Sequence, residues 1–361
     1  MRGMWALGIG LGAALLMACA PAGGGERASG APAPAAAAAP ARPAGAEAPT
    51  AATPPPEIKK LVFAVPQVNG TTMAYAIGAQ QGFFREEGFE VEIPAMRTEL
   101  IAAGLLSGEV DYISAFSPAI NNALTGVPLR LIATTVSHST RRLMSVPEVQ
   151  SIEGLRGKII TVQGFADGPH SAAVLILKHY GLDPQSDVGW LTGGSTVADR
   201  LLFMDQGRAH AAIFSGAEIP RAEAMGYVTL VRVDDVVPLP ESGVATTLSR
   251  IETQRDEVKR VLRAVVRSLR WTKGNREGSI PAYMERLRLS REDAEQAYDG
   301  GAWAYSDDGT VSERGLRVGI DVERGHLDIA EDVPFSRVAD FGPLYEVLAD
   351  MGITPTPDAA R

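Results

Sequence analysis

The sequence has one cysteine and five histidines, and these low numbers limit the chemistry that it can carry. Cys19 is the single thiol, so the chain holds no cysteine pair for a disulfide and no cysteine cluster for a metal centre. The histidines follow none of the spacings of a zinc site: His138, His170, His179, His210 and His326. We therefore expect no catalytic cysteine, no metal site and no cofactor.

Positive charge is also scarce, because 34 lysines and arginines face 43 aspartates and glutamates, for a net charge of −9. Nucleic-acid phosphates are bound by clustered lysines and arginines, which a chain this acidic lacks. It also has no polybasic stretch to hold anionic lipid. We expect no nucleic-acid partner, and any membrane attachment has to rest on acyl chains.

The N-terminal apolar run, Trp5 to Leu16, is too short to cross a bilayer as a stable helix. It follows Arg2, as the apolar region of a signal peptide follows a positive charge. The residues from Leu16 to Cys19 resemble the bacterial lipoprotein signal, in which the cysteine becomes the lipidated first residue. We predict a signal peptide at 1–18 and lipidation of Cys19; a plain secretory peptide cut nearby is the alternative.

The segment from the lipidated cysteine to Pro56, residues 19–56, is rich in alanine, proline and glycine and has almost no large apolar residue. Such a composition buries too little surface to offset the entropy of ordering, so it predicts a disordered tether. The localisation that follows is the cell envelope, at the periplasmic or extracellular face, with the protein held to the membrane by its lipid only.

The stretch from Leu61 to Ile93 shows how the folded body is built. An apolar strand ends at Pro66, a polar turn follows, Thr71 and Thr72 are good helix caps, and a second strand alternates apolar with acidic residues up to Ile93. The loop at the start of the helix carries unpaired N–H groups and suits a small polar ligand. The alternative is an ordinary strand–helix–strand unit with a solvated loop.

Short strands alternate with helical patterns up to about Val233, which predicts an α/β fold. The segments 106–117 and 204–215 repeat one pattern, a helix end, a glycine, a strand and then Phe-Ser, and so suggest two lobes that are built alike. From Ser242 the pattern becomes helical, after a strand at 243–247 that returns to the first lobe. The helices are predicted at 253–272, 281–288, 291–298 and 343–351.

Several short motifs resemble a known family. They are Gly82–Gly88, Ser107–Asp111, Gly126–Pro128, Leu155–Lys158 and Gly207. In their order and spacing they are similar to the extracytoplasmic solute-binding proteins for sulfonates, taurine, nitrate and thiamine-pyrimidine precursors, which serve ATP-driven importers. The likeness covers about residues 61–351. One departure is His210, where an aspartate is usual; we interpret this position as one that supports the fold locally.

The resemblance implies a two-lobed α/β fold of the periplasmic-binding-protein type II kind, with a ligand cleft between the lobes. Lobe 1 would comprise residues 57–145 and 243–361, and lobe 2 residues 146–242, with hinges near 141–146 and 233–243. The implied function is capture of a small organic solute or oxyanion by a monomer, without catalysis, and its delivery to the permease and ATPase of an ABC transporter.

Two other functions stay open. The fungal thiamine-pyrimidine synthases resemble the same family but depend on a cysteine-rich motif, which a chain with Cys19 alone lacks. A serine–histidine pair such as Ser171 with His170 has no nucleophile-elbow context. A sensory ligand-binding module without transport would share the fold.

The predicted ligand contacts lie in the loops at strand ends, where hydroxyls and helix-start amides can hold oxygen atoms. They are Gln67, Asn69, Thr71, Thr72, Ser114, Ser117 and Thr135 from the first lobe, and Asp167, His170, Ser171, Ser195 and Ser215 from the second. For each of them, capping its own helix is the alternative role.

The sequence is compatible with ligands of either charge. Helix N-termini favour an anion, and Arg97 could reach inward, whereas Asp167 and Glu218 bring negative charge. Stacking of an aromatic ligand is equally open, on one of three strand-end or loop phenylalanines: Phe116, Phe165 or Phe214.

Overall fold

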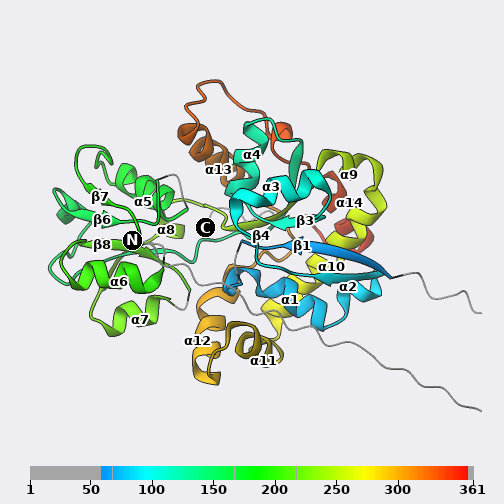
Figure 1. The fold of residues 1–361 in the computed structure, drawn as a ribbon, viewed down its shortest axis with the longest axis horizontal. Helices are drawn as coiled ribbons and strands as arrows, with labels where there is room; N and C mark the ends of the chain where they lie inside the picture. Colours follow the sequence, from blue (N-terminus) through cyan, green and yellow to red (C-terminus); the bar gives the residue numbers. More distant parts are fainter. Residues whose placement is uncertain (1–57, 67, 166–167, 195, 217, 357–361) are drawn as a thin grey trace, which may run out of the picture. The chain divides into compact units, whose positions relative to one another are not determined.

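Two five-stranded sheets form the framework of the protein in a computed structural model (Figure 1). The structure describes residues 58–356 except 67, 166, 167, 195 and 217. The first sheet has the order β2-β1-β3-β10-β4, with β1 (Lys59–Ala64), β2 (Phe89–Glu92), β3 (Tyr112–Ser114), β4 (Leu129–Val136) and β10 (Ser242–Thr247). The second has the order β7-β6-β8-β5-β9, with β5 (Arg142–Ser145), β6 (Ile159–Thr161), β7 (Gly189–Leu191), β8 (Ala211–Phe214) and β9 (Val228–Arg232).

The two sheets have the same topology. In the first, β1 is parallel to β2 and β3, and β10 is inserted antiparallel between β3 and β4. In the second, β6 is parallel to β7 and β8, and β5 is inserted antiparallel between β8 and β9. The internal similarity predicted between 106–117 and 204–215 is therefore confirmed, since these segments contain the equivalent strands β3 and β8.

The chain passes between the sheets twice, after β4 and after β9. The strand β5, which follows the first passage, pairs with β8 and β9, so the second sheet begins at Arg142. The strand β10, which follows the second passage, returns to the first sheet, as predicted. We call the first sheet with its helices lobe 1 and the second sheet with its helices lobe 2.

Helices cover both faces of the sheet in lobe 1 (Figure 1). The strand β1 shows why, because Leu61 and Phe63 point into one apolar core and Ala64 into the other. One core includes residues of α1, α10, α11, α12 and α14, and the other includes residues of α3, α4 and α13. The longest of these helices, α10, buries Val258, Val261, Leu262, Val265 and Leu269 at helical spacing.

The helical elements of lobe 1 are α1 (Met73–Gln80), α2 (Phe83–Glu86), α3 (Thr98–Ser107), α4 (Ser117–Leu124), α9 (Leu248–Thr253), α10 (Arg255–Gly274), α11 (Arg276–Leu287), α12 (Arg291–Gly301), α13 (Glu313–His326) and α14 (Gly342–Asp350), with 3-10 turns η1 (Gly70–Thr72), η3 (Ala302–Ala304) and η4 (Phe335–Arg337). Those of lobe 2 are η2 (Glu153–Leu155), α5 (Gly168–His179), α6 (Val197–Asp205), α7 (Glu218–Ala224) and α8 (Val233–Val236). In the part of the chain that the structure describes, no helix combines the length and the apolar character that crossing a bilayer requires.

One predicted helix has a different start in the structure, and two elements were not predicted. The helix expected at 281–288 begins at Arg276, and Pro281 lies inside it. The helix α13 was not predicted, although Leu316 and Ile320 are buried at helical spacing on it. The strand β5 was also missed, because its four residues show no alternating pattern that sets them apart from a loop.

Candidate ligand-binding cleft

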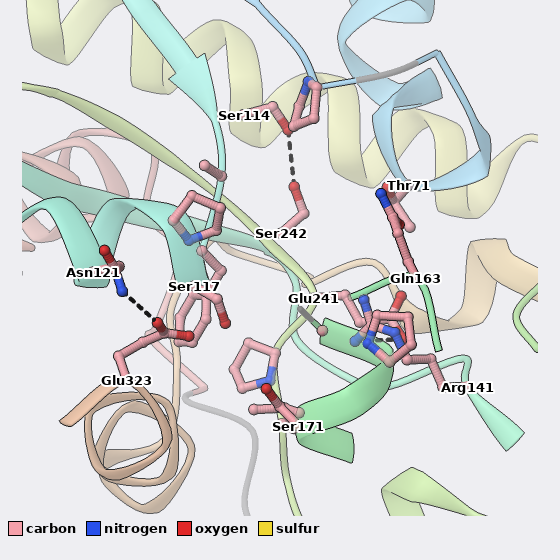
Figure 2. Close-up of a pocket in the computed structure, with 18 of the residues that line it drawn as sticks. Thr71, Ser114, Ser117, Asn121, Arg141, Gln163, Ser171, Glu241, Ser242 and Glu323 are labelled. Carbon is pink, nitrogen blue, oxygen red and sulfur yellow. Dashed lines mark hydrogen bonds and ion pairs between the residues drawn. The ribbon is translucent and has the colours of Figure 1, made fainter. Parts of the chain in front are cut away.

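A pocket of about 630 Å³ is lined by polar and apolar residues of both lobes (Figure 2). This volume is in the range of small-molecule sites. The first lobe and the returning chain contribute Pro66, Asn69, Thr71, Thr72, Ala102, Ser114, Ala115, Phe116, Ser117, Pro118, Asn121, Asn122, Leu239, Pro240, Glu241, Ser242 and Glu323. The second lobe and the first passage contribute Arg141, Gln163, Phe165, Gly168, Pro169 and Ser171.

Three helices of at least eight residues begin at this pocket. The 3-10 turn η1 leads into α1, Ser117 and Pro118 open α4, and Gly168 and Pro169 open α5. The first N–H groups of a helix have no partner within the helix and carry a partial positive charge. The pocket therefore receives backbone donors from both lobes.

Thr72 is the N-cap residue of α1, one of the two caps that the sequence suggested, but its side chain makes no capping hydrogen bond to α1. The side-chain cap belongs to Asn69, which caps the preceding turn η1. The Asn69 side-chain oxygen accepts hydrogen bonds from the Thr71 N–H at 3.0 Å and from the Thr71 hydroxyl at 2.7 Å. In return, the Thr72 hydroxyl accepts from the Asn69 N–H at 3.1 Å, which completes a capping box. These bonds fix the orientation of the three side chains at the pocket wall.

The end of β3 is tied to β10 beside the pocket. The hydroxyls of Ser114 and Ser242 are 2.9 Å apart and share a hydrogen bond (Figure 2). The deeper residue Thr135 is fully buried, bonds with the Tyr75 hydroxyl at 2.9 Å, and does not line the pocket. Burial raises the pKa of Tyr75 in spite of its bonds to neighbouring hydroxyls, so its phenol stays protonated and holds Thr135 in place.

The one cation among the described lining residues is Arg141, at the end of the first passage between the sheets. Its guanidinium lies 3.6 Å from the carboxylate of Glu241, on the second passage. The same carboxylate, with a side chain 3% exposed, accepts from the Ser139 hydroxyl and from the Thr140 N–H, both at 2.8 Å. The two passages are thus bonded to each other next to the ligand space.

A second carboxylate, Glu323 of α13, lies at the opposite side of the pocket in Figure 2. It accepts a hydrogen bond of 3.0 Å from the side-chain amide of Asn121 on α4. The ring of His326 lies between the lobes, with Nδ1 3.6 Å from Glu323 and Nε2 3.3 Å from the Ser171 hydroxyl of lobe 2.

The structure brings half of the predicted contacts together at the pocket: Asn69, Thr71, Thr72, Ser114, Ser117 and Ser171. His170 does not line it, and packs edge-on to the rings of Phe165 and Trp190. Ser215 is also outside it, and its N–H donates to Glu218. Gln67, Asp167 and Ser195 lie outside the described residues.

Among the aromatic residues considered from the sequence, Phe116 and Phe165 line the pocket, and Phe165 is 65% exposed. Phe214 is fully buried in the core of lobe 2. Arg97 is exposed and contributes nothing to the lining.

Six charged and amide residues of the pocket were not predicted from the sequence: Asn121, Asn122, Arg141, Gln163, Glu241 and Glu323. Arg141 and Glu241 lie in the two predicted hinges. Because both hinges run past the cleft between the lobes, polar residues within them could have been predicted as lining residues. Glu323 could have been found only with α13, whose start at Ser312 carries a cap signal and is followed by apolar residues at helical spacing. Across residues 58–356, less the five gaps, no group of three or more metal-binding side chains occurs.

Comparison with known proteins identifies the family. The family model described as NMT1/THI5 like matches residues 69–278. The chain belongs to the NMT1/THI5-like family. No curated protein matches the NMT1/THI5-like chain by sequence.

Solved structures share the fold of this NMT1/THI5-like chain at low sequence identity. The periplasmic aliphatic sulphonate binding protein SsuA from Escherichia coli superimposes with a TM-score of 0.67 at 14% identity, covering 80% of this chain and 99% of that one. A putative periplasmic sulfonate-binding SsuA from Methylobacillus flagellatus gives 0.67 at 16%, covering 84% and 99%. The periplasmic nitrate-binding protein NrtA from Synechocystis gives 0.63 at 11%, covering 84% and 92%. The predicted two-lobed periplasmic-binding-protein type II-like fold is confirmed.

Proposed function

We propose that the protein binds a small polar organic solute or oxyanion in the cleft and delivers it to the permease of an ABC importer. The observation that carries this proposal is the pocket itself, because hydroxyls, amides and helix N-termini of two separate lobes face one space of about 630 Å³. Such groups bind polar atoms without the cost of burying an unpaired charge.

The fold likeness supports the same function. The similar structures named above are a sulphonate-binding, a putative sulfonate-binding and a nitrate-binding periplasmic protein. Closure of the lobes about the two passages would trap the ligand, and the closed form would be what the permease recognises. We further propose that the chain works as a monomer in the cell envelope, at the periplasmic or extracellular face of a membrane to which a lipid on Cys19 attaches it.

The test is a thermal-stability screen of the purified full chain against sulfonates, nitrate, pyrimidines, aromatic acids and amines. A ligand at 100 times its dissociation constant stabilises the folded state by about 2.7 kcal/mol, so a true ligand raises the melting temperature. Mass spectrometry should recover the ligand unchanged after prolonged incubation. Conversion of the ligand to a product refutes a role in binding alone.

Two matched variants locate the site. Ser117→Phe puts a ring into the pocket at the start of α4 and should abolish the rise in melting temperature. Ser249→Phe adds the same ring at an exposed position of α9 and should leave the rise unchanged. Equal ligand responses in the two variants contradict a site in this cleft.

A second candidate function is ester hydrolysis. The hydroxyl of Ser171, the imidazole of His326 and the carboxylate of Glu323 lie in a row, in the order in which a serine hydrolase arranges these groups. Against it, the imidazole–carboxylate distance of 3.6 Å is longer than a hydrogen bond, and Ser171 lies in the first turn of α5 and not on a strand–helix elbow. Hydrolysis of p-nitrophenyl acetate that is lost in Ser171→Ala would establish this function. We expect the wild type and Ser171→Ala to release p-nitrophenol at the same background rate.

A further inference from the structure

We propose that Glu323 forms a subsite for a nitrogen-bearing donor group of the ligand, an ammonium or an amino group, with Asn121 holding the carboxylate in position. This inference rests on the proposed function and names a chemical feature of the solute.

Glu323 is a buried carboxylate at the wall of the ligand pocket. Its side chain is 5% exposed, yet it lines the ligand pocket. A carboxylate has two oxygens with about four acceptor positions, and burying it without enough donors is costly. A carboxylate at such a site therefore needs several donors or a cation.

The surrounding protein supplies few donors. Oε2 of Glu323 receives the amide of Asn121 at 3.0 Å and lies 3.6 Å from Nδ1 of His326. Among the residues that the structure describes, no hydrogen bond reaches Oε1. A donor on the ligand would supply the missing partner.

The charges around the pocket favour a donor with positive charge. Arg141, the lining cation, lies beside the carboxylate of Glu241, and Figure 2 shows this pair on the side opposite to Glu323. Glu323 consequently has no arginine or lysine partner among the described residues. An ammonium or amino group at Glu323, with an acceptor group toward Arg141 and the helix N-termini, would match both sides of the pocket.

A purely structural role for Glu323 is to tie α13 to α4 through Asn121. A neutral glutamine could accept the same bond from Asn121 and would avoid the cost of burying a charge. The charge is therefore the feature that distinguishes the two roles, and Glu323→Gln removes it with little change of shape.

The experiment measures dissociation constants of the full chain for three pairs of probes that differ by an amino group in place of a methyl group. The pairs are taurine with propane-1-sulfonate, β-alanine with butyrate, and 4-aminopyrimidine with 4-methylpyrimidine. In the wild-type protein the amino member of at least one pair should bind about tenfold or more tightly than its methyl partner, since a hydrogen bond to a charged group contributes that much.

Three variants distinguish ligand recognition from a structural role of Glu323. Glu323→Gln should bring the ratio of the two dissociation constants within a pair to about one, whereas Glu323→Asp should keep a preference for the amino member. Glu331→Gln, which changes an exposed carboxylate, should match the wild type. A purely structural role would weaken both members of a pair equally in Glu323→Gln. The melting temperature of each variant without ligand verifies that it is folded.

The outcomes also distinguish this inference from the proposed function. Binding of methyl members as tightly as amino members overturns the donor subsite and leaves solute binding intact. An amino preference that survives in Glu323→Gln also overturns the subsite. Absence of binding by all six probes overturns the donor subsite and counts against the proposed function for these ligand classes.

Discussion

Asp111 and His210 occupy equivalent positions in the two lobes and accept equivalent hydrogen bonds. Oδ2 of Asp111, just before β3, accepts from the N–H of Val62 in β1 at 2.8 Å. Nδ1 of His210, just before β8, accepts from the N–H of Ile159 in β6 at 3.3 Å. This hydrogen bond agrees with the interpretation of His210 as a fold-supporting position, with an imidazole in place of the carboxylate as acceptor.

These two positions should differ in their contribution to stability. Asp111 also forms an ion pair with Arg250 at 2.5 Å, whereas His210 makes no ion pair with the described residues. We expect His210→Ala to lower the free energy of unfolding by about 1 kcal/mol and Asp111→Ala by about 2–3 kcal/mol, because bonds to charged groups are the stronger ones. Urea unfolding measures both, and His179→Ala, an exposed change, is the control. A larger loss in His210→Ala than in Asp111→Ala contradicts this account.

The close contact between α1 and α10 gives a second prediction. A Cβ atom at Gly78 would lie 1.7 Å from the Ser268 hydroxyl and 2.6 Å from its Cβ. We expect Gly78→Ala to destabilise the protein by about 2 kcal/mol through overpacking, and Ser268→Gly to recover part of this loss in the double variant.

The control for this contact is Gly274→Ala, at the end of α10. A Cβ at Gly274 meets nothing within 4 Å, so this variant should be neutral or slightly stabilised. Thermal unfolding of the wild type and of these three variants tests the prediction. A Gly78→Ala protein as stable as Gly274→Ala would show that the helices move apart at little cost.

The buried acid Glu257 on α10 makes stability depend on pH. Burial raises the pKa of its carboxyl, but the hydrogen bonds from Lys59 and Arg250 lower it more, so the folded pKa lies below 4.5. A depressed pKa adds stability above the unfolded pKa, and this stability is lost as the pH falls through the folded value. We expect the wild type to lose unfolding free energy as the pH falls below about 4.5.

Glu257→Gln should remove this part of the acid sensitivity. The variant should be less stable than the wild type at pH 7 by about 2 kcal/mol, and the difference should shrink toward pH 3. Chemical unfolding at pH 3, 4, 5 and 7 measures it, with Glu331→Gln as an exposed control. A constant difference at all four pH values would exclude Glu257 as the titrating group.

Membrane attachment through Cys19, which lies outside the described residues, is tested by fractionation. Wild-type protein should sediment with membranes and be released by detergent, and metabolic labelling with a fatty acid should mark it. Cys19→Ala should appear in the soluble fraction, because acyl chains supply the binding free energy. A variant that remains wholly with the membranes contradicts lipidation at this residue.

Local signals were enough to predict much of lobe 1 and the likeness of the two lobes. The apolar run of β1, the turn before α1 and the repeat around β3 and β8 depend on neighbours in the sequence, so they can be recognised there. For the same reason six hydroxyl and amide residues of the predicted loops do line the pocket.

Strand β5 could not be predicted from such local signals. Its residues, Arg142–Ser145, become a strand because β8 and β9 offer their backbone groups on both sides. The pairing involves residues far along the chain, and a four-residue segment has no period of its own from which to predict it.

The sequence by itself determined the α/β class, the two similar lobes and the lack of any cysteine pair or cysteine cluster, since composition and short-range pattern carry these features. The tertiary structure alone decided which charges meet in the cleft. It placed His326, and not the adjacent His170, against Ser171, and it set Glu323 of α13 beside Asn121 of α4. The residues in these two contacts are 155 and 202 positions apart in the chain, so helix packing sets the contacts and no local pattern records them.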